Sequence, residues 1–137
     1  MNTHARDRNE RGAISIFIAV LGIAFLMVAG LAVDGGRKLG ALSEARNIAD
    51  NAARAGAQHV DTAAYRTTGI AYLDPEAATQ AAAEFLAAVG QTGTITVTED
   101  TVTVTVQLQV HTRFLPGPWT VSATESATAV LGVEGAP

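Results

Sequence analysis

The stretch RGAISIFIAVLGIAFLMVAGLAVDGGRK, from Arg11 to Lys38, dominates the sequence. Its central part, Ala13 to Val33, contains twenty-one residues without a charge. A helix of this length spans about 31 Å, which matches a bilayer core of about 30 Å. The sequence therefore predicts a transmembrane helix over residues 13–33, preceded by a short tail over residues 1–12.

Two properties of this stretch remain open from the sequence. Its apolar run exceeds the roughly 7–15 residues of a signal peptide, which favours a retained span, although Gly30-Leu31-Ala32 leaves cleavage after Ala32 as an alternative. Three arginines precede the span and Arg37, Lys38 and Arg46 follow it, so the positive-inside rule gives nearly a tie. The short tail and the larger C-terminal part favour a single-pass protein with its N-terminus in the cytoplasm and an exported C-terminal domain.

The remaining chain, residues 34–137, gives no indication of chemistry. It has six Lys or Arg against eleven Asp or Glu, so no basic surface for nucleic acid is expected. There are no cysteines, and His4, His59 and His111 are too far apart for metal-ligand spacing. His59 and Asp61 are more simply explained as solvated surface groups than as a proton-transfer pair. We therefore expect no enzyme activity, no catalytic residue, no metal and no cofactor.

Small residues recur at helical spacing within the span and beyond it. The proposed helix-packing positions are Ser15, Ala19, Gly22 and Ala29, then Leu42, Ala45, Ala49, Ala52 and Gly56. The pattern predicts one helix from about Ala13 to about Thr62, with residues 34–66 assigned to its exported continuation. Such a stripe permits close packing against the domain's own sheet or against a neighbouring copy. Within the span, the abundance of Ala and Gly in membrane helices is an equally good explanation.

The C-terminal head, residues 67–137, is predicted to combine a second helix with a sheet. After a loop over Arg66–Leu73, DPEAATQAAAEFLAAVG has Asp74 as N-cap, Pro75 in the first turn and Gly90 at the end. TITVTEDTVTVTVQLQVH alternates apolar and polar residues, which predicts a hairpin turning at Glu99-Asp100. TVSATESATAVL supplies a third strand in which Glu125 interrupts the apolar face, as expected at a bulge or a sheet edge. The expected fold class is α+β: a long N-terminal helix, a short second helix and a three-stranded antiparallel sheet.

The N-terminal third resembles the TadE/TadG-like family of Flp (tight adherence) pilus-assembly proteins. The resemblance is carried by ERGAISIFIAVLGIAFLMVAGLAVDGGRKL and ARNIADNAARAGAQ, and FLPGPWTVSATESATA is similar to the strand that often closes such chains. It implies a pilin-like fold and a subunit inserted in the cytoplasmic (inner) membrane with an exported head. Its expected role is that of a pilin-like minor subunit or accessory protein of a type IV pilus system. The expected partners are the lipid bilayer and other pilin-like subunits or pilus-assembly membrane proteins.

The resemblance also implies a processing site. A prepilin peptidase would cut after Gly12 and leave Ala13 as the new N-terminus. Pilins and TadE proteins carry a glutamate at the fifth residue after the cut, whereas this chain has Phe17. A carboxylate in the bilayer costs about 2.5–3.5 kcal/mol on insertion scales and is kept where it has a cationic partner. Its replacement by Phe17 favours a tip subunit or an uncut membrane accessory over a repeating major pilin.

The sequence also allows two other functions. One is an anchored extracytoplasmic binding module that uses the threonine-rich face of its sheet. The other is a secreted hydrolase-like domain.

Overall fold

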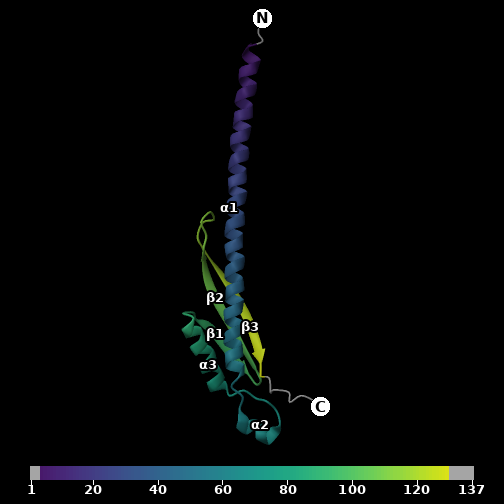
Figure 1. Cartoon of the computed structure of the whole chain (residues 1–137), viewed down its shortest axis with the longest axis vertical. Helices are drawn as coiled ribbons and strands as arrows, with labels where there is room; N and C mark the ends of the chain where they lie inside the picture. Colours follow the sequence, from purple (N-terminus) through teal and green to yellow (C-terminus); the bar gives the residue numbers. More distant parts are fainter. Residues whose placement is uncertain (1–3, 130–137) are drawn as a thin grey trace.

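A computed structural model describes the backbone of residues 4–129 and the side chains of residues 12–129. Three helices, α1 (His4–Ala57), α2 (Thr62–Thr68) and α3 (Pro75–Ala88), precede three strands, β1 (Gly93–Thr98), β2 (Thr101–His111) and β3 (Pro118–Thr128). Figure 1 shows α1 as a single long rod, with the sheet and α3 gathered around its C-terminal part and its N-terminal part projecting alone. The predicted α+β fold with a long N-terminal helix, a short helix and a three-stranded antiparallel sheet is confirmed.

The predicted bounds of α1, from about Ala13 to about Thr62, are wrong at both ends, because the helix begins at His4 and ends at Ala57. Val60 then pairs with Leu73 in an isolated antiparallel bridge. Asp61 starts α2 by accepting hydrogen bonds from the backbone N–H groups of Ala63 and Ala64 at 2.9 and 3.0 Å. A side chain that caps a new helix competes with continuation of the old one, which explains the break. The predicted loop over Arg66–Leu73 is therefore helical up to Thr68.

The termini of α3 agree with the sequence prediction. Asp74 accepts hydrogen bonds from the N–H groups of Glu76 and Ala77, both at 3.1 Å, and Pro75 opens the helix. Gly90 follows the helix with φ +69°, a conformation that glycine adopts without steric cost. These local signals fix where α3 begins and ends.

The sheet has the order β1-β2-β3 and is antiparallel throughout. Its first hairpin turns at Glu99-Asp100, as predicted. The register between β2 and β3 runs without a gap, so the predicted alternative of a bulge at Glu125 is wrong. Glu125 lies opposite Val104 on the edge strand, half-buried, and the edge position accounts for it. The last residue assigned to this strand from sequence, Leu131, lies outside the described residues.

The core lies between α1, α3 and the apolar face of the sheet. Alanines of α1 and valines of β2 meet there with 0% of their surface exposed: Ala45, Ala49, Ala52 and Ala53, and Val102, Val104 and Val106. The cluster is completed by three residues of α3, which are Ala78, Ala82 and Leu86. The small residues of α1 bring the helix backbone close to the valines. At Gly56, an added Cβ atom would lie only 2.8 Å from the carbonyl oxygen of Ala78, so this crossing requires a glycine.

The opposite face of the sheet carries hydroxyl groups in cross-strand pairs. The Oγ1 atom of Thr103 lies 2.8 Å from the Oγ atom of Ser126, and the Oγ1 atoms of Thr105 and Thr124 are also 2.8 Å apart. Cross-strand pairs of this kind stabilise an antiparallel sheet by a fraction of a kcal/mol each. They also leave a regular polar surface on the head.

Candidate functional site

The N-terminal part of α1 is long and apolar enough to cross a membrane. The candidate helix, Gly12–Ala57, contains an 18-residue window with a mean hydropathy of 2.9, of which only 6% is buried. Large apolar side chains such as Phe25, Leu26 and Met27 are 66–72% exposed there. A core helix of a soluble domain would bury them. We call residues 13–33 the apolar half of α1, and residues 34–57 the head half.

The structure separates the predicted helix-packing positions into two groups. Ser15, Ala19, Gly22 and Ala29 lie exposed on the apolar half, and an added Cβ atom at Gly22 would meet nothing within 4 Å. In the head half, Leu42 is half-buried, and Ala45, Ala49, Ala52 and Gly56 are buried against the chain's own sheet and α3. Of the two partners left open by the sequence for the head half, the sheet of the same domain is the one in contact.

The residues of the predicted processing site lie within α1. Gly12 and Ala13 are both exposed, and the helix continues through them. Phe17, at the position where the resemblance implies a glutamate, is 65% exposed. Cleavage between Gly12 and Ala13 stays a prediction.

The sequence pattern did not reveal the role of Asp34, the first charged residue after the apolar half. Its side chain is buried, with 1% of its surface exposed. The carboxylate accepts three backbone hydrogen bonds from the loop between β2 and β3: from the N–H groups of Arg113 at 3.0 Å, Phe114 at 2.9 Å and Leu115 at 2.9 Å. Through these hydrogen bonds, Asp34 connects α1 to a loop that lies about eighty positions further along the chain.

These contacts lower the pKa of Asp34 below its ordinary value. The largest cause is the hydrogen bond from the N–H group of Arg113; those from Phe114 and Leu115 and the positive charge of Arg37 act in the same direction, while burial opposes them. Donors that bind the charged form favour ionisation. Asp34 therefore holds the loop as a carboxylate at neutral pH.

The contacts around Asp34 continue along α1 in both directions. On the N-terminal side, an added Cβ atom at Gly30 would lie 2.8 Å from Cγ of Phe114, so glycine allows the aromatic ring to lie against the helix. On the C-terminal side, Nζ of Lys38 lies 4.5 Å from the ring centroid of Trp119. A cation–π contact of this kind contributes about 0.5–1 kcal/mol at an exposed site. Gly30, Asp34 and Lys38 thus lie one turn apart, and each contacts the β2–β3 region.

With these contacts in place, the comparison with known families can be stated. Residues 12–59 match the family model described as putative Flp pilus-assembly TadE/G-like. The resemblance seen in the sequence is therefore confirmed over this segment. The match to the TadE/G-like model begins at the apolar half of α1, includes Asp34 and the buried alanines, and ends just after the helix. No curated protein and no solved structure matches the chain.

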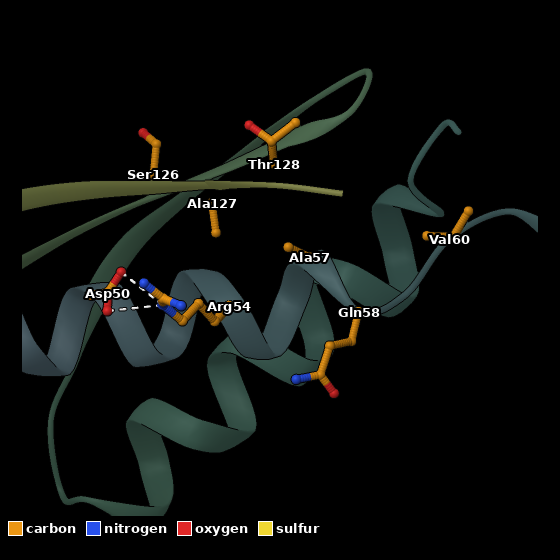
Figure 2. A pocket seen from close by; sticks show the side chains of 8 residues that line it. All are labelled: Asp50, Arg54, Ala57, Gln58, Val60, Ser126, Ala127 and Thr128. Atoms are coloured by element: carbon orange, nitrogen blue, oxygen red, sulfur yellow. Dashed lines mark hydrogen bonds and ion pairs between the residues drawn. The ribbon is translucent and has the colours of Figure 1, made fainter. Parts of the chain in front are cut away.

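A second surface feature lies at the end of the head furthest from the apolar half. One of its walls is the C-terminal part of α1, which belongs to the segment that matches the TadE/G-like model. Figure 2 shows this open pocket, about 440 Å³ in volume, between α1 and β3. Its charged side chains are Asp50 and Arg54, which are paired with each other through the Arg54 Nε atom at 2.9 and 3.0 Å. Ala127 points toward the helix, whereas Ser126 and Thr128 point away from it. The lining therefore provides one neutralised ion pair and no group placed for acid–base chemistry.

The histidines of the described head do not form a site. His59 is exposed after the end of α1, while Asp61 uses its carboxylate to cap α2. His111 is exposed at the end of β2. Among the side chains of residues 12–129 no group of three His, Asp or Glu is placed to hold a metal ion. The distinctive geometry of this chain is thus the apolar half of α1 and the Asp34 contact below it.

Proposed function

We propose that the protein is a non-enzymatic, membrane-anchored, pilin-like minor subunit or accessory protein in the assembly of a Flp/Tad-type (type IV) pilus, acting through helix–helix packing. The observation that carries this proposal is that the TadE/G-like match coincides with α1, whose apolar half is exposed except near Gly30, where the loop between β2 and β3 contacts it. The head half is already covered by its own sheet. Interaction with other pilin-like subunits or pilus-assembly membrane proteins is therefore assigned to the apolar half.

The small-residue face of the apolar half is the proposed contact surface. Ala19 and Gly22 lie within one side of the helix, where small side chains let a second helix approach closely. Ala24 lies on the opposite side, because a helix turns by about 100° per residue. Both sides of the helix are uncharged, but they differ in how closely another helix can approach.

This difference gives a matched experiment in cells that make the pilus. Ala19→Leu should abolish or strongly reduce the number of pili, because the larger side chain separates the helices while the span stays apolar. Ala24→Leu makes the same change on the opposite side and should leave pili at the wild-type number. Pili are counted by electron microscopy, with membrane levels of each variant checked by immunoblot. Equal piliation in the two variants would refute the proposed packing face.

We further propose that the head lies outside the cytoplasmic membrane and the N-terminus inside. The chain has no cysteine, so a single cysteine at exposed Gln80 of α3 reports the side on which the head lies. A membrane-impermeant maleimide should label Gln80→Cys in intact spheroplasts. Labelling only after the membrane is broken would place the head in the cytoplasm.

The position of Phe17 supports a tip or accessory role over a repeating one. If a prepilin peptidase cuts after Gly12, Phe17 leaves the new amine of Ala13 in a neighbouring subunit without a carboxylate partner. Phe17→Glu should then increase incorporation into sheared pilus fractions. An unchanged distribution between membrane and pilus would indicate that this position does not decide the role.

The hydroxyl pairs on the sheet favour one alternative, an anchored extracytoplasmic binding module. Thr103 and Thr105 hold their hydroxyl groups at fixed spacing through Ser126 and Thr124, and Gln107 extends the same face. This function predicts that Thr103→Ala combined with Thr105→Ala abolishes adherence or cell-wall binding while pili still assemble. The packing function predicts normal assembly and normal binding in the same variant.

A further inference from the structure

The loop between β2 and β3, residues 112–117, is the part of the head that reaches furthest along α1 toward its N-terminus (Figure 1). At its tip, Phe114 contacts Gly30, which lies three residues before the end of the apolar half. This corresponds to about 4.5 Å along a helix axis. The loop therefore lies at the same level as the last turn of the span proposed above.

The tip of the loop is apolar and open. Phe114 is 65% exposed, although its ring contacts the helix. Together with Leu115 it borders an open cavity of about 440 Å³ whose other walls are Ile23, Leu26, Met27 and Leu31 of the apolar half. If residues 13–33 span a bilayer, this cavity opens toward lipid, and water would be an unfavourable neighbour for every side chain that lines it.

The backbone of the loop is adapted to such an environment. Irregular backbone is costly near hydrocarbon because its N–H groups lose water as a hydrogen-bond partner. Here the consecutive N–H groups of Arg113, Phe114 and Leu115 all donate to the Asp34 carboxylate. The hydroxyl of Thr112 lies 2.7 Å from the carbonyl oxygen of Leu115 and 2.8 Å from that of Gly117. Three N–H groups and two carbonyl oxygens of the loop therefore have hydrogen-bond partners within the protein.

Basic and aromatic side chains lie near the apolar tip, where Lys38 and Trp119 line a pocket together with Leu115. Arg37, Lys38 and Arg113 are exposed, and Trp119, 41% exposed, lies under the Lys38 ammonium group. The remaining charge at this level, Asp34, is buried and bonded. Tryptophan and long basic side chains are typical of the bilayer interface, where the basic groups reach lipid phosphates.

We propose that Phe114 and Leu115 insert into the outer interface of the phospholipid bilayer beside α1, with Arg37, Lys38, Arg113 and Trp119 at the level of the headgroups. The head is then attached to the membrane at two adjacent points, the span and the loop, and its height above the bilayer is fixed by Asp34. Phe114, at the level of Gly30, then lies about 4.5 Å inside the end of the span, slightly less than the roughly 5–10 Å to which interfacial segments bury their apolar side. The proposal rests on the proposed membrane span and is independent of the role in a pilus.

The experiment uses the full chain in vesicles of phosphatidylcholine with a minority of phosphatidylglycerol. Single cysteines at Phe114, Leu21 and Gln80 carry an environment-sensitive fluorophore, and each sample is compared in ordinary lipid and in lipid brominated on the acyl chains. We expect the label at Phe114→Cys to lose most of its fluorescence in brominated lipid and to resist aqueous iodide. The label at Gln80→Cys should show the reverse, and Leu21→Cys reports the span itself.

The outcomes separate this proposal from the proposed span. Loss of fluorescence at Leu21 but not at Phe114 overturns the loop insertion and retains the span. No loss at either position overturns both. If the label at position 114 is protected from iodide but loses no fluorescence in brominated lipid, another protein molecule covers the loop. This result also overturns the proposal.

A second measurement requires no substitution. Trp119 is the one tryptophan of the chain, so the intrinsic fluorescence of the unmodified protein reports this position alone. Brominated lipid should reduce its emission strongly. Emission that stays the same in both lipids would contradict the proposal even if the label at Phe114 had disturbed the loop.

Discussion

The two halves of α1 form one continuous helix, but they differ in which side chains are exposed and which are buried. In the apolar half the large side chains are exposed, as at Phe25 and Met27, which are 66% and 72% exposed. In the head half the small side chains are buried, as at Ala49 and Ala52, which have 0% exposed surface. In the head half the small residues bring the helix onto a sheet of valines. In the apolar half they are exposed, and we propose that another helix packs against them.

A charge on the small-residue face of the head half should have the largest effect on stability. Ala52→Glu places a carboxylate among Val102 and its neighbours with no cation built to meet it, and an uncompensated buried charge costs about 3–5 kcal/mol. We expect the head to unfold or to lose most of its free energy of unfolding. Chemical denaturation followed by circular dichroism measures the loss.

The matched control is Asn51→Glu, one residue away on the exposed side of the helix. It should change the free energy of unfolding by less than about 0.5 kcal/mol, as surface substitutions usually do. If both variants lost the same stability, the head half would not be covered by the sheet as described.

Removal of the Asp34 carboxylate should have the next largest effect. Asp34→Ala leaves three consecutive N–H groups of the loop without their acceptor and should lower the melting temperature and shift the emission of Trp119, which lies beside the loop. Asp50→Ala removes a carboxylate whose ion pair with Arg54 lies on the surface, and should cost only about 0.3–0.5 kcal/mol. An equal effect of the two variants on melting temperature would contradict the assigned role of Asp34.

The same carboxylate gives the loop a dependence on pH. Because folding lowers the pKa of Asp34, its contribution to stability is fully present above the ordinary value of 3.8 and is lost as the pH falls through the lower value of the folded state. Trp119 fluorescence should thus be constant from neutral pH to about 5 and change only in stronger acid. In Asp34→Asn, which cannot ionise, this part of the acid transition should be absent. A wild-type transition identical to that of Asp34→Asn would show that another group is responsible.

A larger side chain on the small-residue face of the apolar half should have the smallest effect on the head. Gly22→Leu has open space around it, since an added Cβ atom there would meet nothing within 4 Å. We expect the denaturation curve of the head to be unchanged. Gly56→Leu makes the same substitution in the head half, where the added Cβ would lie 2.8 Å from a carbonyl oxygen, and should be strongly destabilising. Comparable curves for the two would remove the distinction between the halves.

The elements that the sequence predicted well are those with local signals. The alternation in β2, the cap at Asp74 and the glycine at Gly90 each act within a few residues, so the pattern and the structure agree. The end of α1 was predicted too late because the helical spacing of apolar residues continues to Val60. The decisive feature there was the Asp61 cap of the next helix, which starts a new element instead of continuing the old one.

The contact of Asp34 could not be obtained from periodicity, because its three donors lie 79–81 positions further along the chain. The signal present in the sequence was a lone carboxylate directly after a long uncharged run, within the part that resembles the TadE/TadG-like proteins. A charge at that position needs a partner, although the sequence does not say which. Similarly, the stripe from Ala45 to Gly56 predicted close packing, and the sheet and α3 were identified as its partners only by the fold.

The distinction between the two halves of α1 requires that the apolar half remains in the finished protein. The most direct measurement is the intact mass of the protein isolated from the membranes of cells that express the full chain. We expect the mass of a chain that begins at Met1, or at Ala13 if a prepilin peptidase cuts after Gly12. Both of these chains retain the apolar half. The mass of a chain that begins at Val33 would show that this half is removed, and would contradict both the membrane anchor and the packing function.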